Sequence, residues 1–244
     1  LILVDNGIGN KQEAKFFSHY YLHETQTIDA ALAKYGFGKN DITDVFFTLL
    51  HFDHCGGSVE REGDKLVSAF KNATYWSNEE HWNWAVNPND REKASFLKEN
   101  ILPIRESGQL KFLEVSSEWS VVSDKSSSDK ILPAHHSPLS AHLSYYSVSG
   151  HTDNMMLPKI NYKGKTVVYM ADLLPSHGHI PIPYVMAYDM FPLTTLNEKK
   201  SFLKEAVEGD YILFFEHDPV HECCNLQQTE KGIRPKDYFK LEEI

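Results

Sequence analysis

The stretch TLLHFDHCGG, residues 48–57, decides how this sequence is interpreted. His51, Asp53 and His54 stand at H-x-D-H spacing, directly after a run (42–50) that is rich in β-branched and aromatic residues and so predicts a strand. Imidazole and carboxylate groups are ligands that zinc, iron and manganese take from proteins. By itself such a triplet is more often part of a solvated loop, so its meaning depends on what the other strands deliver.

Three further predicted strands are each followed, within a few residues, by a histidine or an acidic residue. These strands cover residues 142–148, 166–170 and 211–215, and they are followed by His151, Asp172 and His217. Each side chain alone has an ordinary explanation, as part of a turn, a helix cap or a hydrophobic core. In layered α/β proteins, however, ligands gather beyond the carboxyl ends of strands. Four strand ends that deliver these donors in order therefore indicate one metal site.

The rest of the pattern alternates strands with helices, which predicts an α/β layered fold. Further strands are predicted at 1–4 and 160–162, helices at 13–35, 77–84, 90–99 and 196–207, and exposed loops or an edge hairpin at 116–130. The helix at 77–84 starts from a capping box at Ser77–Glu80. No repeat and no linker is apparent, so we expect one domain over 1–244. Whether its first strand is complete is left open.

Composition restricts the class of partner. A chain of 244 residues can bury a sizeable core without disulfides, and its three cysteines form no C-x-x-C pair. The net charge of −10 argues against a nucleic-acid backbone as partner. No apolar run reaches the length of a membrane-spanning helix. We expect a cytoplasmic protein that acts on a small molecule; a lost signal peptide and a homodimer are both left open.

Taken together, these motifs resemble the metallo-β-lactamase-fold hydrolases, a family with an H-x-H-x-D-H motif after a strand and later single His, Asp and His ligands. The resemblance is carried, in the family's order, by VDNGIGN (4–10), HFDHCGG (51–57), SGHTDNMM (149–156), YMADLLPS (169–176) and FFEHDP (214–219). It covers essentially the whole chain. It implies a four-layered αβ/βα sandwich with a pair of metal ions along one edge.

The resemblance also implies how six ligands divide between the two metals. It suggests His51 and His151 for the first ion, Asp53, His54 and His217 for the second, and Asp172 as a bridge. The implied metal is zinc, two ions, with iron or manganese as alternatives. The departure is Leu49, which stands at the first histidine position and has no donor atom. Two imidazoles, the bridge and a hydroxide still make four donors, enough for tetrahedral zinc, so we expect a weakened first site. The His135-His136 pair is a replacement donor that we do not favour.

Such a centre performs metal-assisted hydrolysis. Metal ions held there would lower the pKa of a water molecule towards neutrality for attack on a carbonyl or phosphoryl centre, and Asp53 would orient the hydroxide. The motifs look like the branch that holds quorum-quenching acyl-homoserine lactonases, related esterases and organophosphate hydrolases, so lactones or other esters are the expected substrates. Pro175 stands where these lactonases often carry a tyrosine. Tyr184 and Tyr188 are candidate replacements, with core packing as the favoured alternative.

An apolar wall for the substrate is a further expectation. Trp82 and its aromatic neighbours are the candidates, with a helix packed on the core as an equally weighted alternative. Two other functions are left open. One is an oxygen-using iron enzyme of the same fold, such as a persulfide dioxygenase. The other is a catalytically impaired metal-binding protein, because Leu49 replaces a ligand.

Overall fold

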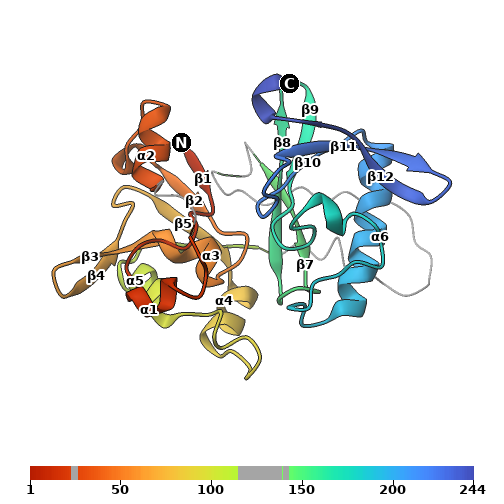
Figure 1. Ribbon diagram of the computed structural model, residues 1–244. Helices are drawn as coiled ribbons and strands as arrows, with labels where there is room; N and C mark the ends of the chain where they lie inside the picture. Colours follow the sequence, from red (N-terminus) through yellow and green to blue (C-terminus); the bar gives the residue numbers. More distant parts are fainter. Residues whose placement is uncertain (23–26, 115–138, 140–142) are drawn as a thin grey trace. The chain divides into compact units, whose positions relative to one another are not determined.

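The computed structural model describes residues 1–22, 27–114, 139 and 143–244. Contacts within the chain divide it into two compact units, Leu1–Leu113 and Glu114–Ile244, and each unit has its own main sheet (Figure 1). This division does not decide the expectation of a single domain, which stays a prediction. The expected loops at 116–130 and the His135-His136 pair lie outside the described residues.

The first unit is built on a four-stranded sheet in which all neighbours are parallel, in the order β1-β2-β5-β6. The strands are β1 (Ile2–Val4), β2 (Asp44–Phe46), β5 (Thr74–Asn78) and β6 (Leu110–Leu113), and a separate hairpin pairs β3 (Val59–Glu62) with β4 (Lys65–Ser68). Because the strands run the same way, the chain leaves β1 and β2 at the same edge of the sheet. Asp5 and the stretch that leads to His51 start from that edge.

Short helices complete the first unit. They are α1 (Ala14–Phe17), α2 (Ile28–Lys34), η1 (Lys39–Asp41), α3 (Phe52–Cys55), η2 (Gly56–Ser58), α4 (Glu79–Val86) and α5 (Lys98–Glu106). In the described residues of the range 13–35, the predicted helix is present only in part, as α1 and α2. The helix predicted at 77–84 is confirmed, but its cap is Asn78, whose side chain accepts a hydrogen bond from the His81 N–H at 2.7 Å.

The helix predicted over 90–99 is wrong, because the helix begins only at Lys98. The Asn89 side chain accepts hydrogen bonds from the N–H groups of Arg91 (2.9 Å) and Glu92 (3.1 Å). An asparagine that bonds to the backbone just after it stabilises a turn in competition with a helix. Residues 91–95 accordingly form turns.

Glycines of the opening stretch are required by a close approach of two backbone segments. A Cβ atom built at Gly56 would lie 2.2 Å from the carbonyl oxygen of Ile8. The Gly57 N–H donates to the carbonyl of Gly7 at 3.0 Å, which joins the same two segments. The loop after β1 is thereby fixed against the end of α3, which carries two of the expected ligands.

The second unit is built on a six-stranded sheet in the order β12-β11-β10-β9-β8-β7. Its elements are β7 (Ser144–Val148), β8 (Met155–Tyr162), β9 (Lys165–Tyr169), η5 (His177–His179), α6 (Pro192–Glu208), β10 (Ile212–Phe214), β11 (Cys223–Thr229), β12 (Gly232–Phe239) and η6 (Leu241–Glu243). Helix α6 packs against β11 and β12. The strands predicted before His151, Asp172 and His217 are confirmed, whereas β11 and β12 were not predicted.

Strand direction decides where the expected ligands of this unit leave the sheet. β8 is antiparallel to both β7 and β9, and β9 is parallel to β10. β7, β9 and β10 therefore all run in one direction, and the residues that follow them leave at one edge. This is the arrangement that the alternating pattern of strands and donors predicted.

Two expectations drawn from composition can be compared with the structure. Within the described ranges, no helix has both the length and the apolar character that crossing a bilayer requires. All three cysteines, Cys55, Cys223 and Cys224, are buried and form no disulfide in this structure.

Replacing Gly56 with alanine should lower the free energy of unfolding by about 1–3 kcal/mol, the usual cost of forcing a methyl group into a packed region. The new methyl group would meet the Ile8 carbonyl, which belongs to the backbone and cannot turn aside. Urea unfolding measures the change. Gly38→Ala is the matched control, because its nearest neighbour, Asp41 Oδ2, would lie at an ordinary 3.8 Å. Equal stability of Gly56→Ala and the unmodified protein would contradict the close approach.

Candidate metal centre

His54 is held by a buried carboxylate. The residue lies in α3 and is fully buried, and its Nδ1 atom lies 3.0 Å from Oδ2 of Asp5. Asp5 also accepts hydrogen bonds from the backbone N–H of Thr48 (2.8 Å) and from its hydroxyl (2.5 Å). Because a carboxylate only accepts, Nδ1 is the donor, and the neutral ring keeps its lone pair on Nε2. Nε2 is then the nitrogen suited to bind a metal.

His51 and Asp53 occupy the same short segment. His51 immediately precedes α3 and Asp53 lies in its first turn. The His51 ring is buried and packs edge-on against Phe96, with ring centroids 4.6 Å apart. Its Nε2 atom lies 3.6 Å from Oε1 of Glu92. The first unit therefore carries three of the six expected ligands within four consecutive residues.

In the second unit, the Asp172 carboxylate stands between two imidazoles. Nε2 of His151 lies 3.0 Å from Oδ2 of Asp172, and Nε2 of His217 lies 3.3 Å from Oδ1. The three residues follow β7, β9 and β10, whose ends share one edge of the sheet. A carboxylate whose two oxygens face different imidazoles has the donor arrangement of a ligand shared by two cations. The donor set fits zinc by its chemistry.

His151 has a second carboxylate behind its ring. Its Nδ1 atom lies 3.0 Å from Oδ1 of Asp189. Burial lowers the pKa of His151, but the charges and hydrogen bonds of Asp172 and Asp189 outweigh burial and raise that pKa to about 9. The contact at Nδ1 leaves Nε2 directed at Asp172. As in His54, a carboxylate thus selects the nitrogen that would face a metal.

Two neighbouring residues of α6 hold the backbone segments that lead to His151 and to Asp189. The Glu198 carboxylate accepts hydrogen bonds from the N–H groups of Ser149 (2.7 Å) and Gly150 (3.0 Å). The buried Lys199 ammonium donates to carbonyl oxygens of residues 181, 182 and 184, at 3.2, 3.3 and 2.5 Å. Burial lowers the pKa of Lys199 to about 8. Helix α6 therefore fixes both the turn after β7 and a loop that leads to Asp189.

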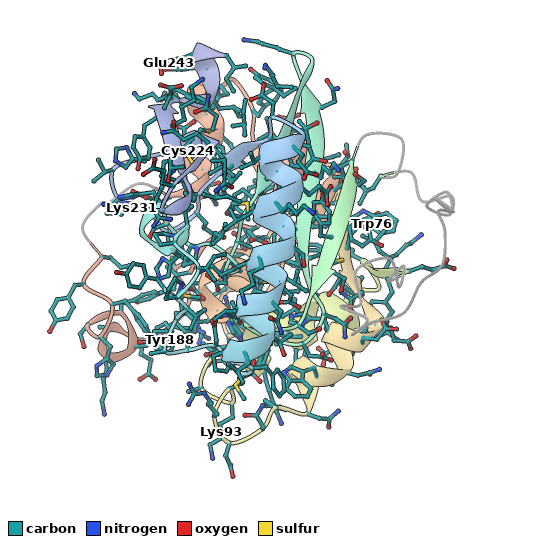
Figure 2. All side chains as sticks on the ribbon, turned by 90° about the vertical axis from the view of Figure 1, so that its right-hand side faces the viewer. Trp76, Lys93, Tyr188, Cys224, Lys231 and Glu243 are labelled. Atoms are coloured by element: carbon teal, nitrogen blue, oxygen red, sulfur yellow. The ribbon has the colours of Figure 1, made fainter. Side chains whose placement is uncertain are left out.

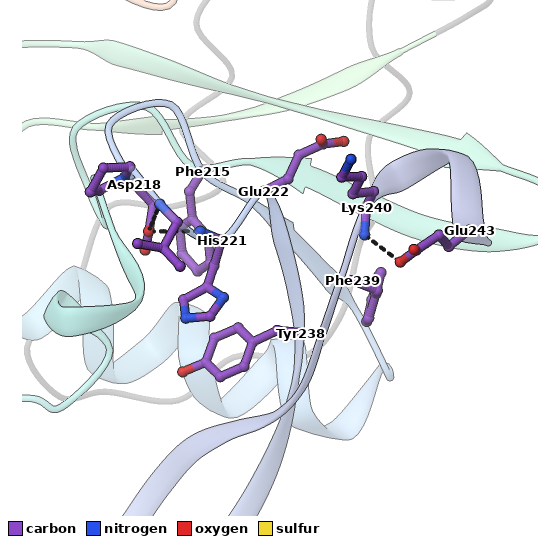
Figure 3. A pocket seen from close by; sticks show the side chains of 10 residues that line it. Phe215, Asp218, His221, Glu222, Tyr238, Phe239, Lys240 and Glu243 are labelled. Carbon is purple, nitrogen blue, oxygen red and sulfur yellow. Dashed lines mark hydrogen bonds between the residues drawn. The ribbon is translucent and has the colours of Figure 1, made fainter.

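A cavity of about 420 Å³ opens beside the segment that follows His217 (Figure 3). Its wall includes His221 and Tyr238, whose rings stack with centroids 3.7 Å apart. Asp218, also in the wall, accepts hydrogen bonds from the His177 ring at 2.5 Å and from the His221 N–H at 2.9 Å. These contacts hold the pKa of Asp218 well below its usual range, although burial opposes them. The sequence did not single out this cavity.

The three expected substrate contacts lie in different surroundings. Trp82 is buried in the core of the first unit and packs against Phe112, so the alternative of a helix packed on the core describes it. Tyr184 and Tyr188, the latter labelled in Figure 2, are 62% and 79% exposed. Core packing, the favoured alternative for both tyrosines, is therefore wrong. Contact of any of the three with a substrate stays a prediction.

Carboxylates behind the histidines are what the sequence did not reveal. The sequence motifs include Asp5 only within VDNGIGN, and they do not include Glu92, Asp189 or Glu198. A carboxylate that acts by contact needs no fixed spacing from its histidine: 49 residues separate Asp5 from His54. The one available signal was the position of Asp5 directly after a predicted strand.

Replacing Asp189 with asparagine should lower the pKa of His151 in protein stripped of metal by a chelator. That pKa is about 9, above the unfolded value of about 6.5, so the charged ring stabilises the fold fully below pH 6.5. This contribution is lost as the pH rises towards 9. The variant should show a smaller loss over the same range. NMR titration of the ring measures the pKa, with exposed Asp210→Asn as the control. An unchanged His151 pKa in the Asp189 variant would contradict the assignment.

No family model and no curated protein matches the sequence. Solved structures do match, over nearly the whole chain. A probable metal-dependent hydrolase from Staphylococcus aureus has 24% identity and a TM-score of 0.80, covering 100% of this chain and 78% of that one. AidC, a dizinc quorum-quenching lactonase, has 21% identity and a TM-score of 0.72, covering 98% and 76%. The hydrolase AbOPH of the β-lactamase superfamily has 17% identity and a TM-score of 0.68, with the same coverage as AidC. The chain therefore has the metallo-β-lactamase fold that its motifs implied.

Proposed function

We propose that this protein is a metal-dependent hydrolase that opens lactones or cleaves related esters, with a small molecule as its substrate. The observation that carries the proposal is the Asp172 carboxylate, whose two oxygens face Nε2 atoms of two different histidines. The structural neighbours include a probable metal-dependent hydrolase, which supports the reaction, and a dizinc lactonase, which supports the substrate class.

Six side chains would hold the two metal ions. His51 and His151 would hold the first, Asp53, His54 and His217 the second, and Asp172 would be shared. Zinc bound there would act as a Lewis acid and lower the pKa of a water molecule to about 7. Buried Leu49 adds no donor, which makes the first ion the more weakly held of the two.

The protein's own residues would divide the remaining work. Asp5 and Asp189 would keep His54 and His151 in the tautomer that directs Nε2 to the ions. The Asp172 carboxylate would offset the positive charge. Asp53 would accept the proton of the attacking water on a carboxylate oxygen and pass it to the oxygen of the departing alcohol. Ester and water would thereby give a carboxylic acid and an alcohol.

Replacing Asp172 with asparagine should weaken both metal sites together, because the change keeps the shape and removes a shared negative charge. We expect metal affinity to fall by about 10–100-fold or more, because mutation of residues that only support metal ligands already costs that much. Elemental analysis at limiting zinc gives the metal content, and lactone hydrolysis gives the rate. Exposed Asp210→Asn should leave both unchanged. Loss of only one ion, or of neither, would show that Asp172 is not shared.

The substrate class is tested with one panel on one preparation. Purified protein of measured metal content should hydrolyse lactones and simple carboxylic esters faster than phosphotriesters and β-lactams. A protein that contains iron and needs oxygen for turnover would instead be the oxygen-using enzyme of this fold. A protein that binds two metal ions yet turns over none of the panel would be the impaired metal binder. Either result would overturn the proposed hydrolysis.

A further inference from the structure

Two of the histidines proposed as ligands follow one rule. His54 contacts Asp5 and His151 contacts Asp189, each through Nδ1 and each at 3.0 Å. In both pairs the carboxylate and the imidazole are buried. The carboxylate accepts the ring N–H, which leaves the lone pair on Nε2 and makes the ring a stronger electron donor. A third pair in the structure departs from this rule.

His51 also has a buried carboxylate beside it, but at the opposite nitrogen. Oε1 of Glu92 lies 3.6 Å from Nε2 of His51, which is within ion-pair range and beyond a hydrogen bond. Only 4% of Glu92 is exposed. Its neighbour on that side is thus one of the proposed metal ligands.

The Glu92 carboxylate is held in place from its other side. Oε2 accepts hydrogen bonds from the indole N–H of Trp84 (2.8 Å) and from the side-chain amide of Asn89 (2.7 Å). Asn89 in turn accepts the backbone N–H of Glu92 at 3.1 Å. Burying a carboxylate costs free energy unless such bonds compensate it. These contacts hold Oε2, and Oε1 of the same carboxylate faces His51.

We propose that Glu92 is a positioning residue for His51: its Oε1 atom accepts a hydrogen bond from the Nε2–H group of His51 when that ring binds a metal. The neutral ring then has its lone pair on Nδ1, the nitrogen opposite the carboxylate. Oε1 and Nε2 close from 3.6 Å to hydrogen-bond distance in the process. This inference rests on the proposed metal-dependent function and deepens it.

Leu49 explains why this contact matters in this chain. The first site has two imidazoles and the shared carboxylate, since leucine adds no donor. With one fewer imidazole, the affinity of that site depends more strongly on how well each remaining ring donates. A carboxylate hydrogen-bonded to the ring raises its basicity. Glu92 thereby offsets part of the loss of metal affinity that results from leucine at position 49.

Glu92→Gln tests the role sharply, because glutamine keeps the volume and one acceptor oxygen. That oxygen can still accept from Trp84 and Asn89, while the amide nitrogen would donate to Nε2 of His51. The ring proton would then move to Nδ1. We expect about 10–100-fold weaker binding of one of two zinc ions, the usual cost of losing such a contact, with the other ion unaffected. Chelator competition measures both affinities.

A second readout does not depend on activity. In ¹⁵N NMR spectra of the metal-free proteins, His51 should carry its proton on Nε2 in the unmodified protein and on Nδ1 in Glu92→Gln. Zinc loading of the unmodified protein should keep the proton on Nε2. Glu106→Gln, an exposed glutamate of α5, is the control and should change neither affinity nor tautomer. Urea unfolding of each variant confirms that it is folded. Leu49→His added to Glu92→Gln should restore affinity at the weakened site.

The outcomes separate this inference from the proposed function. Equal zinc affinities and an unchanged tautomer in Glu92→Gln would overturn the role of Glu92, whatever the substrate panel shows. A protein that turns over no ester or lactone, yet loses one zinc ion in Glu92→Gln, would overturn the proposed substrate and support the role of Glu92. A zinc-loaded crystal structure with Oε1 and Nε2 still 3.6 Å apart would contradict the closure.

Discussion

The buried carboxylate of Asp5 is the constraint on which the position of the proposed ligands of the first unit depends. It lies just after β1 with a positive φ of 50°, and it accepts hydrogen bonds from Thr48 and His54. A buried charge is tolerated only when its partners are in place, and removing one partner typically costs about 3–5 kcal/mol. The exits of β1 and β2 and helix α3 therefore cannot move independently. The geometry of His54 is a consequence of how this charge is buried.

In the second unit, too, the residues after the strands are the proposed ligands, and other elements supply the carboxylates that hold them. The exits of β7, β9 and β10 deliver the proposed ligands, while the loop before α6 and α6 itself supply the carboxylates behind them. Asp189 contacts the ring of His151, and Glu198 holds the backbone just before it. Strands thus determine which donors share an edge, and the residues between strands determine which ring nitrogen each histidine presents.

The same arrangement explains which residues and elements could be predicted from the sequence. A strand followed by a donor leaves a local pattern, so His151, Asp172 and His217 could be predicted together with the strands before them. Asp189 lies 38 residues from the histidine that it contacts, and no spacing rule connects the two. The helix expected at 90–99 failed for a related reason, because the Asn89 side chain competes for backbone N–H groups. Strands β11 and β12 have largely polar sequences without a clear alternation, and they were missed.

The buried Lys199 has a consequence for how this protein can change over evolutionary time. Among the described residues, its ammonium group donates to backbone carbonyls of the loop that follows η5, and every residue type has such a carbonyl. The anchor is therefore insensitive to which side chains the loop displays, among them the exposed Tyr184. Mutations can exchange those outer side chains while the backbone that leads to Asp189 stays in place. The surface that the loop presents can diversify without a cost to the support of His151.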